Sequence, residues 1–160
     1  MRLIKFFALL AALTTVAALT AVAAQADSGA NLQAILRPVA GAPDNGFGLV
    51  KFRQPKDADK IVYLDVWVRD LAPNHSYYLE RATDSNVNDD CTGRNWLKLG
   101  QGAVSQAFTT DETGTGRANL FRNLAMFSVG TQFDIHFRVT DAGTSAVVLQ
   151  STCYQFTVSQ

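Results

Sequence analysis

The fold of this 160-residue chain is decided by the stretch Ile61-Val62-Tyr63-Leu64-Asp65-Val66-Trp67-Val68-Arg69. Successive side chains of a β-strand point to opposite faces of a sheet, so the even-numbered residues of this stretch, all Val or Leu, share one face. The odd-numbered residues on the other face are of mixed polarity. This alternation predicts a strand with one face in the core.

A second stretch, Phe133 to Val139, alternates more strictly, with apolar residues at odd positions and polar residues at even positions. It predicts a half-buried strand. Asp134, His136 and Arg138 would lie on its polar face, and we expect His136 to be exposed or hydrogen-bonded there.

Other short stretches carry strand signals, and turn-forming residues such as those of Gly41 to Gly46 and Asp111 to Gly114 separate them. Residues 118–127 also fit a helical stripe, but we expect a strand that turns into a loop near Arg122. About eight or nine short antiparallel strands at this spacing predict an all-β sandwich or flattened barrel. The remaining expected strands are residues 31–39, 47–53, 76–82, 96–99, 106–110, 115–121 and 147–158.

The first residues resemble a secretory leader. Arg2 and Lys5 precede an uncharged run from Phe6 to Ala24, and Ala24-Gln25-Ala26 matches the small-x-small cleavage pattern. We therefore expect a signal peptide over residues 1–26, a single domain over residues 27–160, and a protein that is secreted or periplasmic. The alternative is an uncleaved membrane anchor. The Ala- and Thr-rich composition favours removal, and thus no stable membrane insertion of the mature chain.

The charge of the mature chain argues against a nucleic-acid partner. Removal of Arg2 and Lys5 would leave 12 basic and 14 acidic residues, a formal charge of −2. The basic residues are scattered and form no stripe that would follow a phosphate backbone.

The two cysteines, Cys91 and Cys153, are expected to form a disulfide, because an exported protein folds in an oxidising compartment. The alternative is a pair of buried thiols. On the chain-entropy model, closing a loop of about sixty residues stabilises a fold by about 4 kcal/mol.

The order of these features resembles the copper/zinc superoxide dismutase family, whose fold is a Greek-key β-sandwich. A polar loop with one cysteine and a last strand with the other resemble the intrasubunit bridge of that family. The other stretches that carry the resemblance are Gly48 to Gln54, the strand ending at Asp70-Leu71, His75 to Leu79 and the turn from Thr110 to Gly116.

The metal site of that family has no counterpart in this chain. The family's His-x-His copper ligands would fall on Tyr78 and Glu80, and its anion-guiding arginine would fall on Gln150. His75 and His136 are the only histidines of the chain, too few for a copper centre with a bridged zinc. We therefore expect no metal centre, no cofactor and no dismutase activity.

One polar loop places oxygen-bearing side chains at alternate positions, as calcium loops do: Asp84, Asn86, Asn88 and Asp90. The stretch is not an EF-hand, because its sixth position is Asp89 rather than Gly. A solvated loop is the alternative to an irregular calcium site.

Three aromatic residues suggest a surface for a ligand or partner. Tyr63 and Trp67 lie on the outer face of one expected strand, about 13 Å apart at the usual strand rise. Tyr78 would extend this patch if it occupies the vacated metal position. Such a row can stack sugar rings or contact a protein, although outer faces are often covered by a loop.

These observations favour an exported, non-catalytic binding or structural module whose partner is an extracellular protein or glycan. One alternative is an enzyme of unrecognised type, such as a carboxylate-based hydrolase that uses the Asp134/His136 face or the loop from Asp84 to Asp90. Another alternative is a calcium-dependent adhesion module.

Overall fold

The computed structural model describes residues 31–42, 45–55 and 58–159. The expected leader, residues 1–26, lies outside this described part. Within it, no helix has the length and apolar character needed to cross a membrane.

The described chain is all-β, as predicted. Four of its strands are only two residues long, so eight longer strands carry the fold. The strands in chain order are β1 (Asn31–Pro38), β2 (Phe47–Arg53), β3 (Ile61–Arg69), β4 (Ser76–Asp84), β5 (Leu97–Lys98), β6 (Gly100–Gln101), β7 (Val104–Ser105), β8 (Phe108–Thr109), β9 (Gly116–Asn123), β10 (Gln132–Asp141), β11 (Val147–Ser151) and β12 (Tyr154–Thr157).

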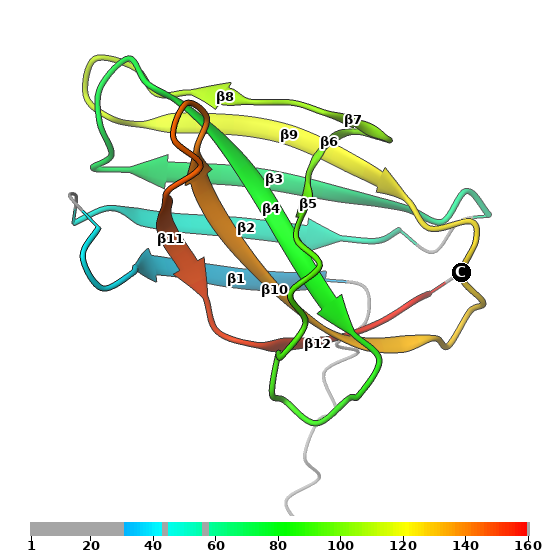
Figure 1. Cartoon of the computed structure of the whole chain (residues 1–160). Helices are drawn as coiled ribbons and strands as arrows, with labels where there is room; N and C mark the ends of the chain where they lie inside the picture. The colour runs from blue at the N-terminus through cyan, green and yellow to red at the C-terminus, as the bar shows by residue number, and fades with distance from the viewer. Residues whose placement is uncertain (1–30, 43–44, 56–57, 160) are drawn as a thin grey trace, which may run out of the picture.

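The longer strands form two layers with Greek-key connections. One layer contains β1, β2, β3 and β9, and the strands of the other, β4, β10 and β11, cross over it obliquely (Figure 1). The chain passes from β3 to β4 in the opposite layer, and β9 and β10 then lie beside β3 and β4. β11 joins the layers, because it pairs with both β10 and β1.

Short segments between β4 and β9 nearly close the sheet into a flattened barrel. β5 and β8 both pair with β4, and β6 pairs with β9. The contact of β6 with β9 is parallel, and the other strand pairs of the described chain are antiparallel.

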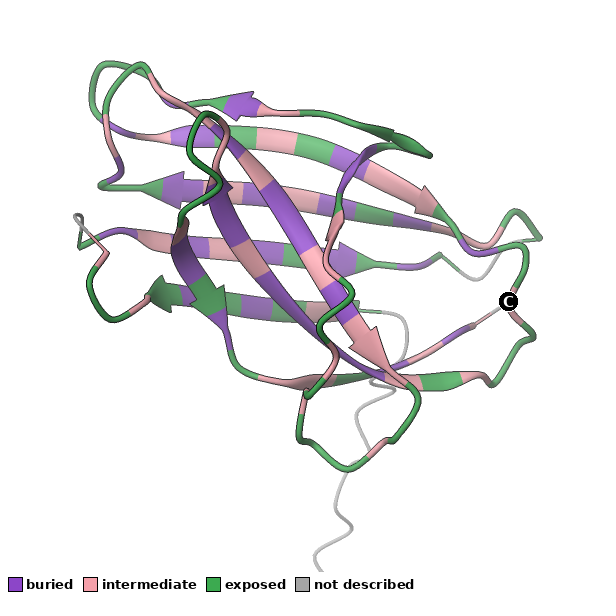
Figure 2. Cartoon of the chain, in the orientation of Figure 1, coloured by how far each residue is buried: buried purple, intermediate pink, exposed green. Residues whose placement is uncertain are grey.

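The core lies between the two layers, where buried and exposed residues alternate along the strands (Figure 2). All four even-numbered apolar residues of β3, from Val62 to Val68, are buried, which confirms the prediction for this strand. They face buried residues of the other layer such as Leu79 and Phe137. Burying one side chain of this kind contributes roughly 1.5–3 kcal/mol.

The prediction of a half-buried strand over residues 133–139 is wrong, because β10 is buried on both faces. Asp134 and His136 lie on the outer face of their layer, yet both are buried. The loop of residues 85–96 covers this face: the rings of Trp96 and His136 are 4.5 Å apart, and His136 Nε2 lies 3.1 Å from the Gly93 carbonyl oxygen. Of the two states expected for His136, the hydrogen-bonded one is therefore correct.

The expected last strand, residues 147–158, is divided into β11 and β12. Three residues, Ser151 to Cys153, stand opposite two residues of β10, and this extra residue breaks the ladder. The Phe137 amide donates instead to Ser151 Oγ at 2.9 Å. The expected strands at 96–99 and 106–110 are shorter than predicted and correspond to β5 and β8, and two further short strands, β6 and β7, lie between them.

The predicted disulfide is confirmed. Cys91 and Cys153 are bonded, with their Cα atoms 5.2 Å apart and a sequence separation of 62. The bond fastens the loop of residues 85–96 to the chain between β11 and β12.

Candidate functional site

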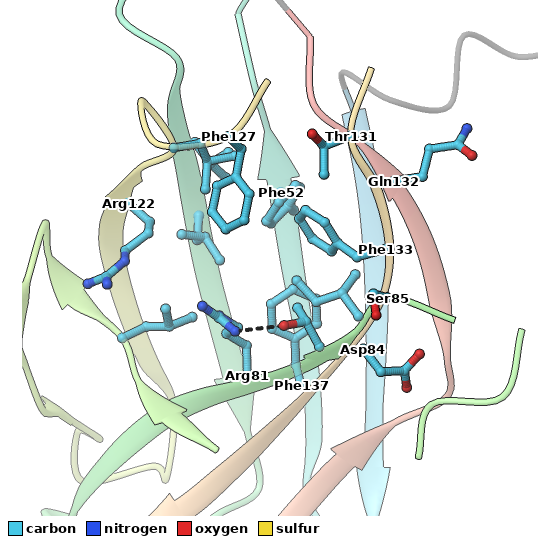
Figure 3. Close-up of a pocket in the computed structure, with 16 residues that line it drawn as sticks. Phe52, Arg81, Asp84, Ser85, Arg122, Phe127, Thr131, Gln132, Phe133 and Phe137 are labelled. Atoms are coloured by element: carbon cyan, nitrogen blue, oxygen red, sulfur yellow. Dashed lines mark hydrogen bonds between the residues drawn. The ribbon is translucent and has the colours of Figure 1, made fainter. Parts of the chain in front are cut away.

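A cavity of about 210 Å³ lies between the layers at one end of the barrel, where β2, β4 and β9 end and β3 and β10 begin. Most of its lining is apolar and includes the rings of Phe52, Phe127 and Phe133 (Figure 3). The other lining residues are Val62, Leu64, Arg81, Thr83, Asp84, Ser85, Leu99, Arg122, Leu124, Thr131, Gln132, Ile135 and Phe137.

The sequence of β4 places an arginine inside this cavity. Tyr77 and Leu79 point into the core, and the alternation continues the same face with Arg81 and Thr83. Figure 3 shows the Arg81 guanidinium among the apolar lining residues. Its Nη1 donates to Thr83 Oγ1 at 3.0 Å.

Arg81 has no acidic partner among the residues that the structure describes. The ion pairs found there within 4.0 Å all involve other residues. Burial, together with repulsion from Arg122, lowers the pKa of Arg81 below its ordinary value. Both effects oppose the positive charge of the guanidinium, so an anion placed beside it would relieve both.

The other charged residues of the lining leave the cavity positive. Arg122 points to the side in Figure 3 and donates to the Gly102 carbonyl oxygen at 2.9 Å. The Asp84 carboxylate points away from the cavity, and its Oδ2 accepts hydrogen bonds from the Thr92 and Gly93 amides. A small apolar molecule with one acidic group would match this combination of rings and an unpaired guanidinium.

Arg81 was not identified from the sequence, although its position carried a signal. Arg81 follows Leu79 by two residues and so lies on the core side of an alternating strand. A charged side chain there needs an acidic partner, contact with water or a bound ligand. The sequence does not show that the opposite layer leaves space there.

The three aromatic residues predicted to form one patch do not lie together. Tyr63 and Trp67 point outward from β3, and Tyr63 is 39% exposed. Tyr78 points outward from β4 in the other layer, where Lys98 Nζ lies 4.2 Å from its ring centre.

Trp67 lines a shallow depression on the outer face of β2, β3 and β9. Its neighbours there include Asp65, Arg117 and Asn119. The ring of Trp67 also packs edge-on against Phe47, with 5.9 Å between centres. An indole beside an amide and charged groups is the type of surface that the sequence predicted for a glycan or protein partner.

The four residues of the predicted calcium loop do not converge on one point. Asp84 Oδ2 and Asn88 Oδ1 accept amide hydrogen bonds within the loop, and Asn86 and Asp90 are exposed. No cluster of three or more His, Cys, Asp or Glu side chains suited to a metal occurs in the described part of the chain.

The face proposed for an enzyme is filled by packing. Arg138 stacks on Trp96 with 4.0 Å from its guanidinium carbon to the ring centre, and its Nε donates to Glu80 Oε2 at 2.7 Å. Glu80 Oε1 also accepts from Thr140 Oγ1 at 3.3 Å. Glu80 and Tyr78, at the positions that the resemblance assigns to copper ligands, are therefore both engaged by neighbouring side chains.

Comparison with known proteins found no matching family model, no matching curated protein and no matching solved structure for this chain.

Proposed function

We propose that this protein is an exported, non-catalytic binding module whose cavity holds a small, largely apolar ligand with one acidic group. The observation that carries the proposal is the Arg81 guanidinium, which lies in an apolar cavity and has no acidic partner among the described residues.

The energetics of Arg81 support a bound anion. Arg81 is half-buried, and a charged group partly withdrawn from water is costly to leave unpaired. A carboxylate can accept two parallel N–H bonds from a guanidinium, which makes it a geometrically specific partner. The surrounding phenyl rings would cover the rest of such a ligand.

The volume limits the size of the ligand. About 210 Å³ is less than the roughly 300–1,000 Å³ of sites for drug-sized molecules. Short-chain or single-ring carboxylic acids are therefore the class to test first.

Two features support export and the resemblance to the copper/zinc superoxide dismutases. A disulfide is compatible with an oxidising compartment. The Greek-key order and the bridge from the long loop to the chain beside the last strand agree with that resemblance, while Tyr78 and Glu80 in place of histidines support a role without copper.

Binding can be tested by calorimetry on the refolded mature chain, with hexanoate as the probe and hexan-1-ol as the uncharged control. We expect hexanoate to bind more tightly than hexan-1-ol. The variant Arg81→Met should weaken hexanoate binding about 10- to 100-fold, because a hydrogen bond to a charged group contributes roughly 1.5–3 kcal/mol.

The matched control is Arg117→Met, which removes an exposed arginine from the outer face of β9. It should leave hexanoate binding unchanged. Equal binding of hexanoate to the wild type and Arg81→Met would contradict the proposal, as would release of product from ester or glycan substrates in an activity screen.

A second candidate function is contact with a glycan or an extracellular protein through the Tyr63 and Trp67 face. The depression beside Trp67 favours it. A partner retained by the wild type and lost by Trp67→Ala would support this function, and a partner retained by both would contradict it.

A further inference from the structure

Two aspartates lie directly opposite each other where β4 and β10 pair. Asp84 and Asp134 are register partners in this antiparallel pair, so their side chains share the outer face of the layer. Cβ atoms of such partners are roughly 4.5–5.5 Å apart. Two carboxylates at this spacing repel each other unless a positive charge or a proton lies between them.

The loop of residues 85–96 uses one oxygen of each carboxylate. Asp134 Oδ2 accepts the Asn88 amide at 3.0 Å, and Asp84 Oδ2 accepts the amides of Thr92 and Gly93 at 3.0 and 3.1 Å. The sheet and the loop therefore hold both carboxylates in place.

The second oxygen of each carboxylate has no partner. Asp84 Oδ1 and Asp134 Oδ1 are both buried without a hydrogen bond, and Asp134 as a whole is 0% exposed. Within the described chain, no Arg, Lys or His nitrogen lies within 4.0 Å of either carboxylate. Buried polar atoms in folded proteins are rarely left in this state.

The loop is held tightly over the pair. Cys91 is bonded to Cys153, and Gly93 packs so closely on β4 that a Cβ atom there would lie 2.5 Å from the Thr83 carbonyl oxygen. The two free oxygens are therefore shielded from open solvent while the loop stays in place.

We propose that Asp84 and Asp134 bind one calcium ion through their Oδ1 atoms, beneath the loop of residues 85–96. The ion supplies the missing partner of both oxygens and leaves the three amide hydrogen bonds intact. An all-oxygen, irregular donor set suits calcium, which accepts six to eight oxygen ligands in flexible geometry, better than magnesium.

This site differs from the calcium loop predicted from the sequence. That prediction combined Asp84 with Asn86, Asn88 and Asp90, all in one loop. The pair joins Asp84 to a residue 50 positions further along the chain, which alternate spacing in the loop cannot reveal.

The test is a calcium titration by calorimetry, together with thermal unfolding in EDTA, in 10 mM CaCl₂ and in 10 mM MgCl₂, on the disulfide-bonded chain. We expect a Kd of about 10⁻⁴–10⁻³ M, the range of extracellular calcium modules, and a higher Tm in calcium than in magnesium or EDTA. An unchanged Tm in calcium, or an equal rise with magnesium, would overturn the assignment.

Three variants locate the ion. Asp84→Asn and Asp134→Asn each keep an oxygen for the loop amides and remove one charge, so both should fold and lose the calcium shift, with affinity at least tenfold weaker. Asp90→Asn, an exposed change in the same loop, should keep the shift. A shift that survives in Asp134→Asn, or that is lost in Asp90→Asn, would place the ion elsewhere and contradict the proposal.

Discussion

At the scale of single residues, Arg81 illustrates a conflict between stability and binding. Its guanidinium lies on the core side of β4, where its neighbours Tyr77 and Leu79 are buried. Replacing a buried charge by an apolar residue often leaves a fold equally stable or makes it more stable. A role in binding therefore explains the arginine at this position better than a role in stability does.

The variant Arg81→Met should therefore unfold at a higher urea concentration than the wild type, by about 1–2 kcal/mol in the free energy of unfolding, in the absence of ligand. Arg117→Met serves as the control and should change this free energy by no more than about 0.5 kcal/mol. If Arg81→Met were destabilised by about 1 kcal/mol or more, the guanidinium would be a structural element of the barrel.

Asp141 gives the chain a defined acid response. The Thr144 amide donates to Asp141 Oδ1 at 2.7 Å, and this bond, with contacts to His75 and Gly143, lowers the pKa of Asp141 to about 2 despite partial desolvation. An unfolded aspartate has a pKa near 3.9. The unfolded chain therefore binds this proton first as the pH falls.

The stabilisation from Asp141 should be fully present above about pH 4 and be lost between about pH 4 and pH 2. Urea unfolding of Asp141→Asn at several pH values should show a shallower loss of stability in this window than the wild type. Asp90→Asn should retain the wild-type slope, and equal slopes for Asp141→Asn and the wild type would contradict this origin of the acid response.

At the scale of elements, the burial of a strand face can be predicted from the sequence only when no distant segment of the chain covers that face. The alternation of β3 correctly predicted both faces of that strand, because its outer face stays partly open. The alternation of β10 predicted its core face but not its outer one, which a loop from a distant part of the sequence covers. The disulfide was predictable from the two cysteines and the expectation of export, whereas the cavity around Arg81 and the pair of Asp84 and Asp134 depend on contacts between distant parts of the sequence and were not predictable.

Opening the disulfide should loosen the loop of residues 85–96. The variant Cys91→Ser/Cys153→Ser should lose about 2–4 kcal/mol in the free energy of unfolding. Because Trp96 of this loop packs on His136 of β10, the near-ultraviolet circular dichroism of the protein should also decrease.

The two cysteines are the only ones in the chain, so reduction of the wild type by dithiothreitol is an independent control and should reproduce both effects. Stability equal to that of the oxidised protein would show that hydrogen bonds alone hold the loop.

At the scale of the whole molecule, stability depends on the contacts between the two layers. Phe137 of β10 is fully buried, and its ring lies 6.0 Å from that of Phe52 in the opposite layer. It also lines the cavity. A change at this position therefore affects both the core and the site.

The variant Phe137→Ala should lose about 3–5 kcal/mol of unfolding free energy, a large part of the 5–15 kcal/mol typical of a domain. Chemical denaturation followed by far-ultraviolet circular dichroism would measure this loss. Ile35→Ala, at an exposed position on β1, should stay within about 0.5 kcal/mol of the wild type, and a loss below about 1 kcal/mol for Phe137→Ala would show that the layers are joined elsewhere.

The position of β11 has a consequence for how the chain reaches this structure. β11 pairs with the last three residues of β1, Leu36 to Pro38, so this end of β1 stays without its neighbour until residues 147–151 have been synthesised. An uncovered strand edge is a template for pairing with another chain. Export in an unfolded state would postpone folding until β11 can bind, and an interrupted chain that ends before residue 147 should aggregate through β1.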